Sequence, residues 1–451
     1  MGGRKFVTQE KLRQVKEFLE PFKYLANAHM TSFITDNYWE TLPEDIKTEA
    51  TALTVDDMYA TFWSWGRDPA NFNQSTAIGE FFRDCWALSL GSELFDDLLL
   101  SHDTCNETLQ TKRMSVKKNH EISNLKEKVA IICNASKSNC VVDVGGGKGY
   151  LGTSLVLEKQ IHVLSVDSKS HNTKGAVEMF ERATKQAEAS RSGSSLYKHA
   201  TAFVTPETNL LEIVNDKLCS KIDHKICLTG LHVCGDLTST CIKLFLKCHE
   251  IVSLCTIGCC YNLITETYGL NFPSDEKHTG FPLSNFLFKD CYALGRNARM
   301  IACQSIDRIC HERKEMNPSL FWRAALQVHL LRQLGPNCEI SVGRHCSKAT
   351  SFLDYFQKVQ QYLDQDLEEK IQELDFETRG NHDRMIKFYC LRLALAPVIE
   401  TLILLDRLLY LHEEGIENAY IMKVFDGVKS PRCYAIIGVK MEGTISQLFQ
   451  L

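Results

Sequence analysis

VVDVGGGKGYLG, residues 141–152, contains two overlapping glycine motifs that imply different cofactors. An acid-x-G-x-G-x-G motif, typical of S-adenosylmethionine enzymes, consists of Asp143, Gly145, Gly147 and Gly149. A G-x-G-x-x-G motif, typical of nicotinamide and flavin enzymes, consists of Gly147, Gly149 and Gly152. In both cases the glycines let the backbone approach a ligand at the N-terminus of a helix.

The position of the preceding strand separates the two motifs. The β-branched run at residues 140–144 predicts a strand that ends at Val144, so the first glycine after the strand is Gly145. A dinucleotide-binding turn places its first glycine directly at the strand end, but the second motif begins later, at Gly147. This register favours S-adenosylmethionine, with Asp143 and the glycines of the first motif as its predicted contacts.

A second acid, Asp167, closes the next predicted strand at residues 161–167. A carboxylate at this position can accept hydrogen bonds from both ribose hydroxyls of an adenosine ligand. Nicotinamide enzymes use the same contact. Asp167 is therefore a predicted cofactor-binding residue that does not distinguish the two enzyme classes.

The composition is that of a globular protein. Of the 451 residues, 44% are hydrophobic and 24% are charged, and the formal net charge of −5 gives no global electrostatic argument for nucleic acid or membrane binding. The chain has 19 cysteines and no apolar signal core near its N-terminus. This pattern favours a reducing compartment over a disulfide scaffold, so we expect an intracellular protein, cytoplasmic or nuclear and not secreted.

Hydrophobic patterning predicts four regions. Residues 1–135 have helical spacing. In residues 136–261 strands alternate with helices, which predicts right-handed βαβ units and a mostly parallel sheet that holds the donor-binding half of a catalytic core. Residues 262–388 are predicted to be a mostly helical insertion, and residues 389–451 a long helix followed by a strand pair that completes the core.

The most apolar stretch covers residues 393–411. A membrane span would have to contain Glu400, Asp406 and Arg407, and a central Arg or Asp costs roughly 2.5–3.5 kcal/mol. A buried core helix carries no such penalty. We therefore expect a core helix and no membrane span.

Several longer stretches carry a family resemblance. They are FITDNYWETLP (33–43), MSVKKNHEI (114–122), the glycine motif, LTGLHVCGDL (228–237), IGCCYNLI (257–264), APVIETLILLDRLLYL (396–411) and SPR (430–432). Together they resemble the methyltransferase-like protein 25 family, close to its 25B branch, which is similar to class I S-adenosylmethionine-dependent methyltransferases. The resemblance implies an α/β, Rossmann-like fold with a mostly parallel seven-stranded sheet, S-adenosyl-L-methionine as cofactor, and methyl transfer as the reaction.

The catalytic candidates follow the fourth and fifth predicted strands. Ligands of an open parallel sheet bind at the carboxyl ends of its strands, where these loops should converge. His232 is a candidate general base for a hydroxyl or nitrogen acceptor. Asp236 is either its orienting carboxylate or, as we favour, the N-cap of the next helix. Tyr261 is a candidate for stacking on a base or bonding a substrate, or else a lid over the core.

Three cysteines near these candidates admit three interpretations. Cys234, Cys259 and Cys260 could form a zinc site with His232, but the usual Cys-x-x-Cys spacing is absent. Cys260 could also act as a nucleophile on a pyrimidine carbon. Buried packing is the commonest role of cysteine, and we favour it. We keep the three among the substrate-binding candidates and expect no metal.

The basic segment with Lys117, Lys118 and His120 is a candidate substrate-binding arm. Its charge is equally typical of a solvated face, but the family resemblance favours contacts to a phosphate backbone. In addition, His-x-Cys-Gly after the fourth strand and a cysteine-rich motif after the fifth resemble a family of tRNA 2′-O-methyltransferases. We therefore expect RNA as the acceptor. The alternatives are a protein acceptor, a catalytically silent methyltransferase-fold interaction protein and, last, a nicotinamide oxidoreductase.

Overall fold

The computed structural model describes residues 3–100, 114–186, 196–218, 223–269, 279–335, 349–363, 374 and 376–441. The chain divides into two compact units, each described separately below. We call the first, Met1–Glu17 with Leu90–Gly295 and Ile399–Leu451, the sheet unit. The second, Phe18–Ser89 with Arg296–Val398, is the helical unit. The region boundaries expected at residues 135, 261 and 388 stay predictions.

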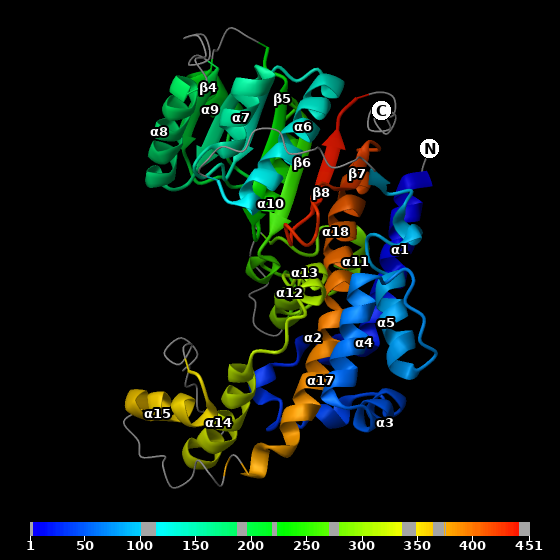
Figure 1. The fold of residues 1–451 in the computed structure, drawn as a ribbon. Helices are drawn as coiled ribbons and strands as arrows, with labels where there is room; N and C mark the ends of the chain where they lie inside the picture. The colour runs from blue at the N-terminus through cyan, green and yellow to red at the C-terminus, as the bar shows by residue number, and fades with distance from the viewer. Residues whose placement is uncertain are drawn as a thin grey trace. The chain divides into compact units, whose positions relative to one another are not determined.

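The sheet unit is built on an eight-stranded sheet with the order β1-β7-β8-β6-β5-β2-β3-β4 (Figure 1). The strands are β1 (Leu99–Leu100), β2 (Cys140–Val144), β3 (His162–Asp167), β4 (Tyr197–Thr201), β5 (Ile226–Cys234), β6 (Ile251–Cys259), β7 (Ala419–Lys423) and β8 (Tyr434–Val439). Strands β2 to β6 run parallel, while β8 runs antiparallel to both β6 and β7. The predicted mostly parallel seven-stranded Rossmann-like sheet with a closing strand pair is therefore confirmed.

The eighth strand, β1, is an addition that the sequence pattern did not predict. It has two residues, which is too short to show an alternating pattern, and it pairs parallel with β7. Its pairing covers part of the edge that β7 would otherwise expose.

Helices cover both faces of the sheet. The helices of this unit are α1 (Gly3–Leu19), α6 (Val116–Ser136), α7 (Tyr150–Lys159), α8 (Ser170–Gln186), α9 (Leu210–Lys217), α10 (Leu237–Lys247), α11 (Asn285–Lys289) and α18 (Ala396–Glu413), with short 3-10 turns at Glu93–Phe95 and Tyr261–Leu263. Apolar side chains of α6, α7 and α8 share one core with alternate residues of the strands. The opposite face meets α10, because Phe245 lies against Gly438 of β8.

Helix α6 brings the basic segment to the sheet. The Ser115 hydroxyl accepts a hydrogen bond from the backbone N–H of Lys118, which caps the helix at its start. Four apolar residues at helical spacing then point into the sheet core: Ile122, Leu125, Val129 and Ile132. The first turn of α6, with its charged side chains, is therefore fixed beside the ends of the strands.

The helical unit contains no strand among its described residues. Its helices are α2 (Lys23–Asn27), α3 (Glu44–Ala52), α4 (Val55–Arg67), α5 (Ala77–Ala87), α12 (Arg296–Ile301), α13 (Ile306–His311), α14 (Pro318–Leu334), α15 (Phe352–Leu363) and α17 (Gly380–Ala394), with 3-10 turns at Glu20–Phe22, Met30–Ser32 and Tyr38–Thr41. Helix α4 starts with a reciprocal capping box between Thr54 and Asp57. Stacked aromatic side chains, including Trp65 on Phe82, fill its core.

One helical stretch in the described part of the chain, Gly380–Glu413, has the length and hydropathy of a membrane span. Of its most apolar window, 89% is buried inside the protein. The charges that the sequence placed there have polar partners: Glu400 accepts from Arg432 at 2.9 Å, and Asp406 accepts from Ser284. This arrangement is that of the predicted core helix.

The buried His412 of α18 predicts a pH-dependent stability. Its Nδ1 accepts from the Thr8 hydroxyl at 3.0 Å and its Nε2–H donates to the Ala419 carbonyl at 3.2 Å. Burial lowers the pKa of His412 to about 4. The folded chain therefore keeps a neutral ring while the unfolded chain takes up a proton below about pH 6.5, so stability is lost as pH falls from 6.5 towards 4. At about 1.4 kcal/mol per pKa unit, the loss is roughly 3 kcal/mol.

Thermal unfolding of wild type and His412→Gln between pH 7 and pH 4.5 measures this contribution. Glutamine can still accept from Thr8 and donate to Ala419 but does not titrate. We expect the unfolding midpoint of the variant to fall less steeply with acid than that of wild type. Parallel curves for the two proteins would contradict the assignment.

Candidate functional site

A cavity of about 410 Å³ lies at the carboxyl ends of the parallel strands. Its wall is formed by the last residues of β2, β3 and β5, the loop after β4, and the first turn of α10. This is where ligands bind in open parallel sheets, and the volume falls within the range of small-molecule sites. The loops after strands β2, β3 and β5 therefore converge as the sequence predicted.

The glycine loop after β2 shows which of the two motifs faces the cavity. Gly145 lines it, and both Gly145 and Gly147 have positive φ values, 71° and 56°. A Cβ atom on Gly147 would meet open space, with its nearest neighbour 3.9 Å away. At Gly149, the residue before α7, a Cβ atom would lie 2.3 Å from the Tyr197 hydroxyl. Gly149 is thus needed for packing, while Gly145 and Gly147 leave bare backbone for a ligand.

Asp143 lies beneath this loop and not on the cavity wall. It is 1% exposed, and neither of its carboxylate oxygens has a hydrogen-bond partner among the described residues. A Cβ atom on Gly146 would lie 2.8 Å from Asp143 Oδ2, so the carboxylate faces the underside of the loop. Burial raises the pKa of Asp143 to about 7. A buried, unpaired carboxyl at this place fits a loop that receives a cationic ligand.

Asp167 lines the cavity and also holds the glycine loop. Its Oδ2 accepts from the backbone N–H of Gly147 at 3.0 Å, and its Oδ1 accepts from Lys169 N and Asn172 Nδ2. Each oxygen has two lone pairs, so these three bonds fill Oδ1 and leave one acceptor site on Oδ2, enough for one ribose hydroxyl. Of the two predicted ribose bonds, Asp167 can accept one without losing a bond that it makes here, and the structure adds a second task, which is to link β3 to the loop after β2.

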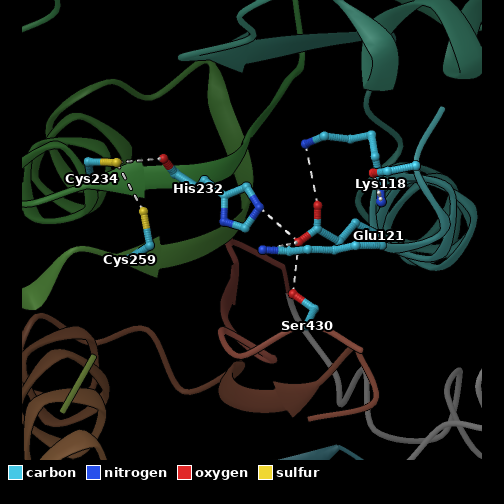
Figure 2. Close-up of polar contacts among 8 residues, drawn as sticks. Lys118, Glu121, His232, Cys234, Cys259 and Ser430 are labelled. Atoms are coloured by element: carbon cyan, nitrogen blue, oxygen red, sulfur yellow. Dashed lines mark hydrogen bonds and ion pairs between the residues drawn. The ribbon is translucent and has the colours of Figure 1, made fainter. Parts of the chain in front are cut away.

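His232 is an extra residue inserted into β5. The pairing with β6 shifts between Leu231 and Val233, whose partners Ile257 and Gly258 are consecutive, so His232 forms a β-bulge. Its φ of 62° is left-handed, which few non-glycine residues adopt. From the bulge its ring points at α6, where Nε2 lies 2.9 Å from Oε1 of Glu121 (Figure 2).

Glu121 is the centre of a charged network (Figure 2). Its side chain is 1% exposed, and Oε1 also accepts from the Ser430 hydroxyl at 2.8 Å. Lys118 Nζ lies 3.3 Å from Oε2 and Lys117 Nζ lies 3.7 Å from Oε1. Burial alone would raise the pKa of Glu121. The hydrogen bond and charge of His232 outweigh this effect, together with the hydrogen bond from Ser430 and the charge of Lys118, so the pKa of Glu121 falls to about 2. Glu121 is therefore ionised at neutral pH.

The two predicted roles of Asp236 need correction. It is not the partner of His232, whose carboxylate partner is Glu121. It is also not a side-chain cap, because it already has helical backbone angles at the start of α10 and makes no capping bond. Its Oδ1 instead accepts from the backbone N–H of Thr265 at 2.8 Å, on the segment after β6. Asp236 does line the cavity.

Tyr261, predicted as a catalytic residue, is in the core. It is 1% exposed, and its hydroxyl donates to Glu400 at 2.8 Å. The guanidinium groups of Arg407 and Arg432 lie 5.6 Å and 5.5 Å from its ring centre. A side chain enclosed in this way cannot reach a substrate, so the core-lid alternative describes it.

His120, predicted as a substrate contact, is also structural. It is 3% exposed, and its Nε2 accepts from the backbone N–H of Asp426 at 3.1 Å. Its ring packs on the edge of Phe425. His120 therefore fixes the segment between β7 and β8 to α6. Of the three predicted basic residues, Lys117 and Lys118 remain partly exposed.

Three cysteines meet at the edge of the cavity. Cys234 lines it and is exposed, Cys259 is buried and Cys260 is half-buried. Cys234 Sγ lies 3.0 Å from Cys259 Sγ and 3.3 Å from the His232 carbonyl oxygen. The hydrogen bond from Cys259 lowers the pKa of Cys234 to about 6. The packing interpretation thus applies to Cys259 but not to Cys234.

Sequence reasoning missed three residues of this site. Glu121 lies in the basic segment, directly after His120. Its position there is the one signal by which the sequence could have indicated a role in the site. Ser430 belongs to the SPR stretch, which gave no hint of its partner. Phe203 follows β4, is 79% exposed and lines the cavity. An apolar ring exposed on a cavity wall is a stacking surface, a property that strand periodicity does not reveal.

Comparisons with known proteins agree with this geometry. Residues 117–267 match a family described as a methyltransferase domain. The chain is 26% identical over 590 aligned residues to the Homo sapiens protein named "Probable methyltransferase-like protein 25", covering 96% of this chain and 97% of that protein. The Mus musculus protein of the same name is 36% identical over 258 residues, which cover 55% of this chain and 42% of that protein.

One solved structure aligns with much of the chain. It is a crystal structure of coclaurine N-methyltransferase bound to N-methylheliamine and SAH, covering 87% of this chain and 95% of that chain, at 10% identity and a TM-score of 0.24. A superposition this loose gives no residue correspondence. The family match and the full-length relative confirm the resemblance and the methyltransferase domain.

A substitution at Phe203 tests where the adenine ring of the cofactor lies. Phe203→Ala should weaken binding of S-adenosylhomocysteine, because stacking of an aromatic side chain on a base contributes about 1–3 kcal/mol. The dissociation constant should therefore rise roughly tenfold, as measured by isothermal titration calorimetry. Phe6→Ala, at a phenylalanine that is 70% exposed on α1, is the matched control and should bind like wild type. Wild-type affinity in Phe203→Ala would place the base elsewhere.

Proposed function

For this chain, a relative of methyltransferase-like protein 25 with an S-adenosylmethionine-dependent methyltransferase domain, we propose that the methyl acceptor is RNA and that His232 is the general base. The observation that carries the proposal is the pair of His232 and Glu121, 2.9 Å apart. A hydroxyl acceptor must lose a proton as its oxygen is methylated. A histidine fixed by a buried carboxylate is suited to take that proton.

The cavity residues fit the methyl donor. Gly145 and Gly147 present bare backbone, Asp167 lies on the wall with acceptor capacity, and the unpaired Asp143 lies beneath the loop. S-adenosylmethionine supplies an electrophilic methyl group when bound. Cys234 lines this cavity, and the proposed base His232 lies two residues before it on β5.

The chain's own residues then have defined tasks. In the tautomer that donates from Nε2 to Glu121, the lone pair of His232 is on Nδ1, and we assign Nδ1 as the atom that takes the acceptor's proton. The ionised Glu121 stabilises the imidazolium that results, as the carboxylate does in a catalytic triad. Ser430 and Lys118 keep that carboxylate charged. The left-handed bulge holds the ring in place, so little reorganisation is needed during transfer.

RNA is supported over protein by the surface next to this pair. Lys117 and Lys118 project from the first turn of α6, with side chains 45% and 33% exposed, on either side of the buried Glu121. Lysines placed beside an acceptor site bind phosphate well. The sequence likeness to tRNA 2′-O-methyltransferases also favours a ribose hydroxyl as acceptor.

The acceptor class is tested with labelled donor and fractionated cell extract. Wild type should transfer label to RNA, and ribonuclease should release it. His232→Asn should lower kcat by about 10²–10⁴-fold, the usual contribution of a general base. Glu121→Gln should lower kcat by a smaller factor and leave the KM for the donor unchanged, because it acts through His232. Thermal shift with S-adenosylhomocysteine checks that both variants keep the donor site.

His249→Asn is the matched control, since His249 is exposed in the loop before β6 and contacts neither the cavity nor Glu121. It should retain wild-type kcat. Protease-sensitive label would identify a protein acceptor and overturn the RNA proposal. Full activity in His232→Asn would remove the histidine from the chemistry while leaving the donor assignment intact.

The lysine pair has a separate test in the salt dependence of RNA binding. Each phosphate contact contributes a slope of about −0.7 in log affinity against log salt for a single strand. Lys117→Ala with Lys118→Ala should therefore weaken binding at low salt and make the slope shallower by about 1.4. Fluorescence anisotropy with a labelled RNA at several salt concentrations measures both quantities.

Lys217→Ala with Lys225→Ala is the charge-matched control. Both lysines are exposed in the same unit, Lys217 on α9 and Lys225 directly before β5, outside the cavity wall. This control should keep the wild-type slope. Equal slopes for the two double variants would show that Lys117 and Lys118 serve Glu121 alone.

A further inference from the structure

The three cysteines at the cavity edge form a cluster of possible metal ligands. The Sγ atoms of Cys234, Cys259 and Cys260 all lie within 4.8 Å of one another. They come from the ends of two adjacent strands, since Cys234 and Cys259 are paired residues of β5 and β6 and Cys260 follows directly. Parallel pairing of β5 and β6 therefore brings together the three cysteines that the sequence analysis grouped.

The spacing of the sulfur atoms suits one ion. Zinc binds thiolate sulfur at about 2.3 Å in tetrahedral geometry, which puts neighbouring sulfurs about 3.8 Å apart. The 3.0 Å between Cys234 and Cys259 would widen by about 0.8 Å, within the reach of a side-chain rotation. Three sulfur ligands from the described part of the chain leave one tetrahedral position, and Cys234 brings the cluster to the wall of the cavity.

The backbone at the cluster is unusual. Cys260 has a φ of 50° and His232 a φ of 62°, both left-handed and neither a glycine. Such conformations cost of order 1–3 kcal/mol each and persist where surrounding structure enforces them, commonly at functional sites. Cys260 turns the chain directly after Cys259, and His232 turns it directly before Val233 and Cys234. Both therefore shape the positions of the thiols.

A buried positive charge lies behind the cluster. Arg407 of α18 is 1% exposed, and its Nε and Nη1 atoms have no hydrogen-bond partner among the described residues. Its Nη1 would lie 2.7 Å from a Cβ atom on Gly258, the residue before Cys259. The carboxylates of Asp406 and Asp236 already act on this guanidinium, and so does the nearby Cys259. Three thiolates around a divalent cation would carry a net charge of −1 and would add to this compensation.

We propose that Cys234, Cys259 and Cys260 bind one zinc ion at the edge of the donor cavity, with the fourth coordination position open. Three protein ligands with an open position are the arrangement of catalytic zinc sites, whereas structural sites use four. Zinc binding releases the thiol protons and leaves the methyl-donor loop unchanged. The site is a property of the chain alone and stands whatever the methyl acceptor is.

The test is metal binding by the full-length protein in a reducing buffer, without methyl donor or RNA. After removal of metal by chelator, wild type should take up one equivalent of Zn²⁺ per chain, measured by elemental analysis and by competition with a chromophoric chelator. Co²⁺ in place of Zn²⁺ should give the intense near-ultraviolet absorption of cobalt–thiolate bonds. Cys234→Ser and Cys260→Ser should each weaken zinc binding by at least about tenfold, since even loss of a group behind the ligands has that effect.

Cys291→Ser, at an exposed cysteine of the same unit, is the matched control and should bind zinc like wild type. Thermal unfolding of the metal-free variants confirms that they fold. Failure of reduced wild type to take up zinc, or equal uptake by wild type and both cluster variants, would overturn the proposal. A Cys234–Cys259 disulfide that forms readily in air while the reduced chain ignores zinc would replace it with a redox pair.

Discussion

The bond between Glu121 and His232 holds together parts of the chain that are far apart in sequence. An ionised carboxylate that is 1% exposed is stable only when its partners replace water. Those partners come from three places: the bulge of β5, the first turn of α6, and Ser430 shortly before β8. The need to satisfy this single charge therefore fixes the helix, the bulge and the final strand pair relative to one another, and it turns the histidine ring towards α6.

Helix α18 supports the site from behind through its own buried charges. Asp406 accepts from the backbone of Leu283 and Ser284, and Glu400 binds both Tyr261 and Arg432. These contacts anchor the segment after β6 and the segment before β8 to the same helix. A helix this apolar would pack without them, but its charges define its rotation and register. The polar residues that argued against a membrane span are thus the ones that position the loops of the site.

The sequence predicted the fold well because its evidence was local. The strand before the glycines, the acid at the end of β3 and the closing strand pair each follow from a short pattern. The site was harder because its contacts join distant elements. Asp236 is a candidate partner of His232, beside the favoured capping role, because it is an acid close to His232 in sequence, whereas the bulge turns His232 towards Glu121 of α6. Tyr261 and His120 carry functional groups suited to a substrate, and only burial shows that these groups are already bound by Glu400 and by the backbone of Asp426.

The position of β8 has a consequence for synthesis on the ribosome. The parallel strands β2 to β6 are complete once residue 259 has left the ribosome. In the finished sheet β8 lies between β6 and β7, so one edge of β6 has no partner until residues 434–439 are made. Glu121 likewise lacks the Ser430 hydroxyl until then. A nascent or shortened chain that stops before β8 carries an open strand edge, which favours association with other chains. The segment that holds Ser430 and β8 therefore both covers the edge of β6 and completes the partners of Glu121.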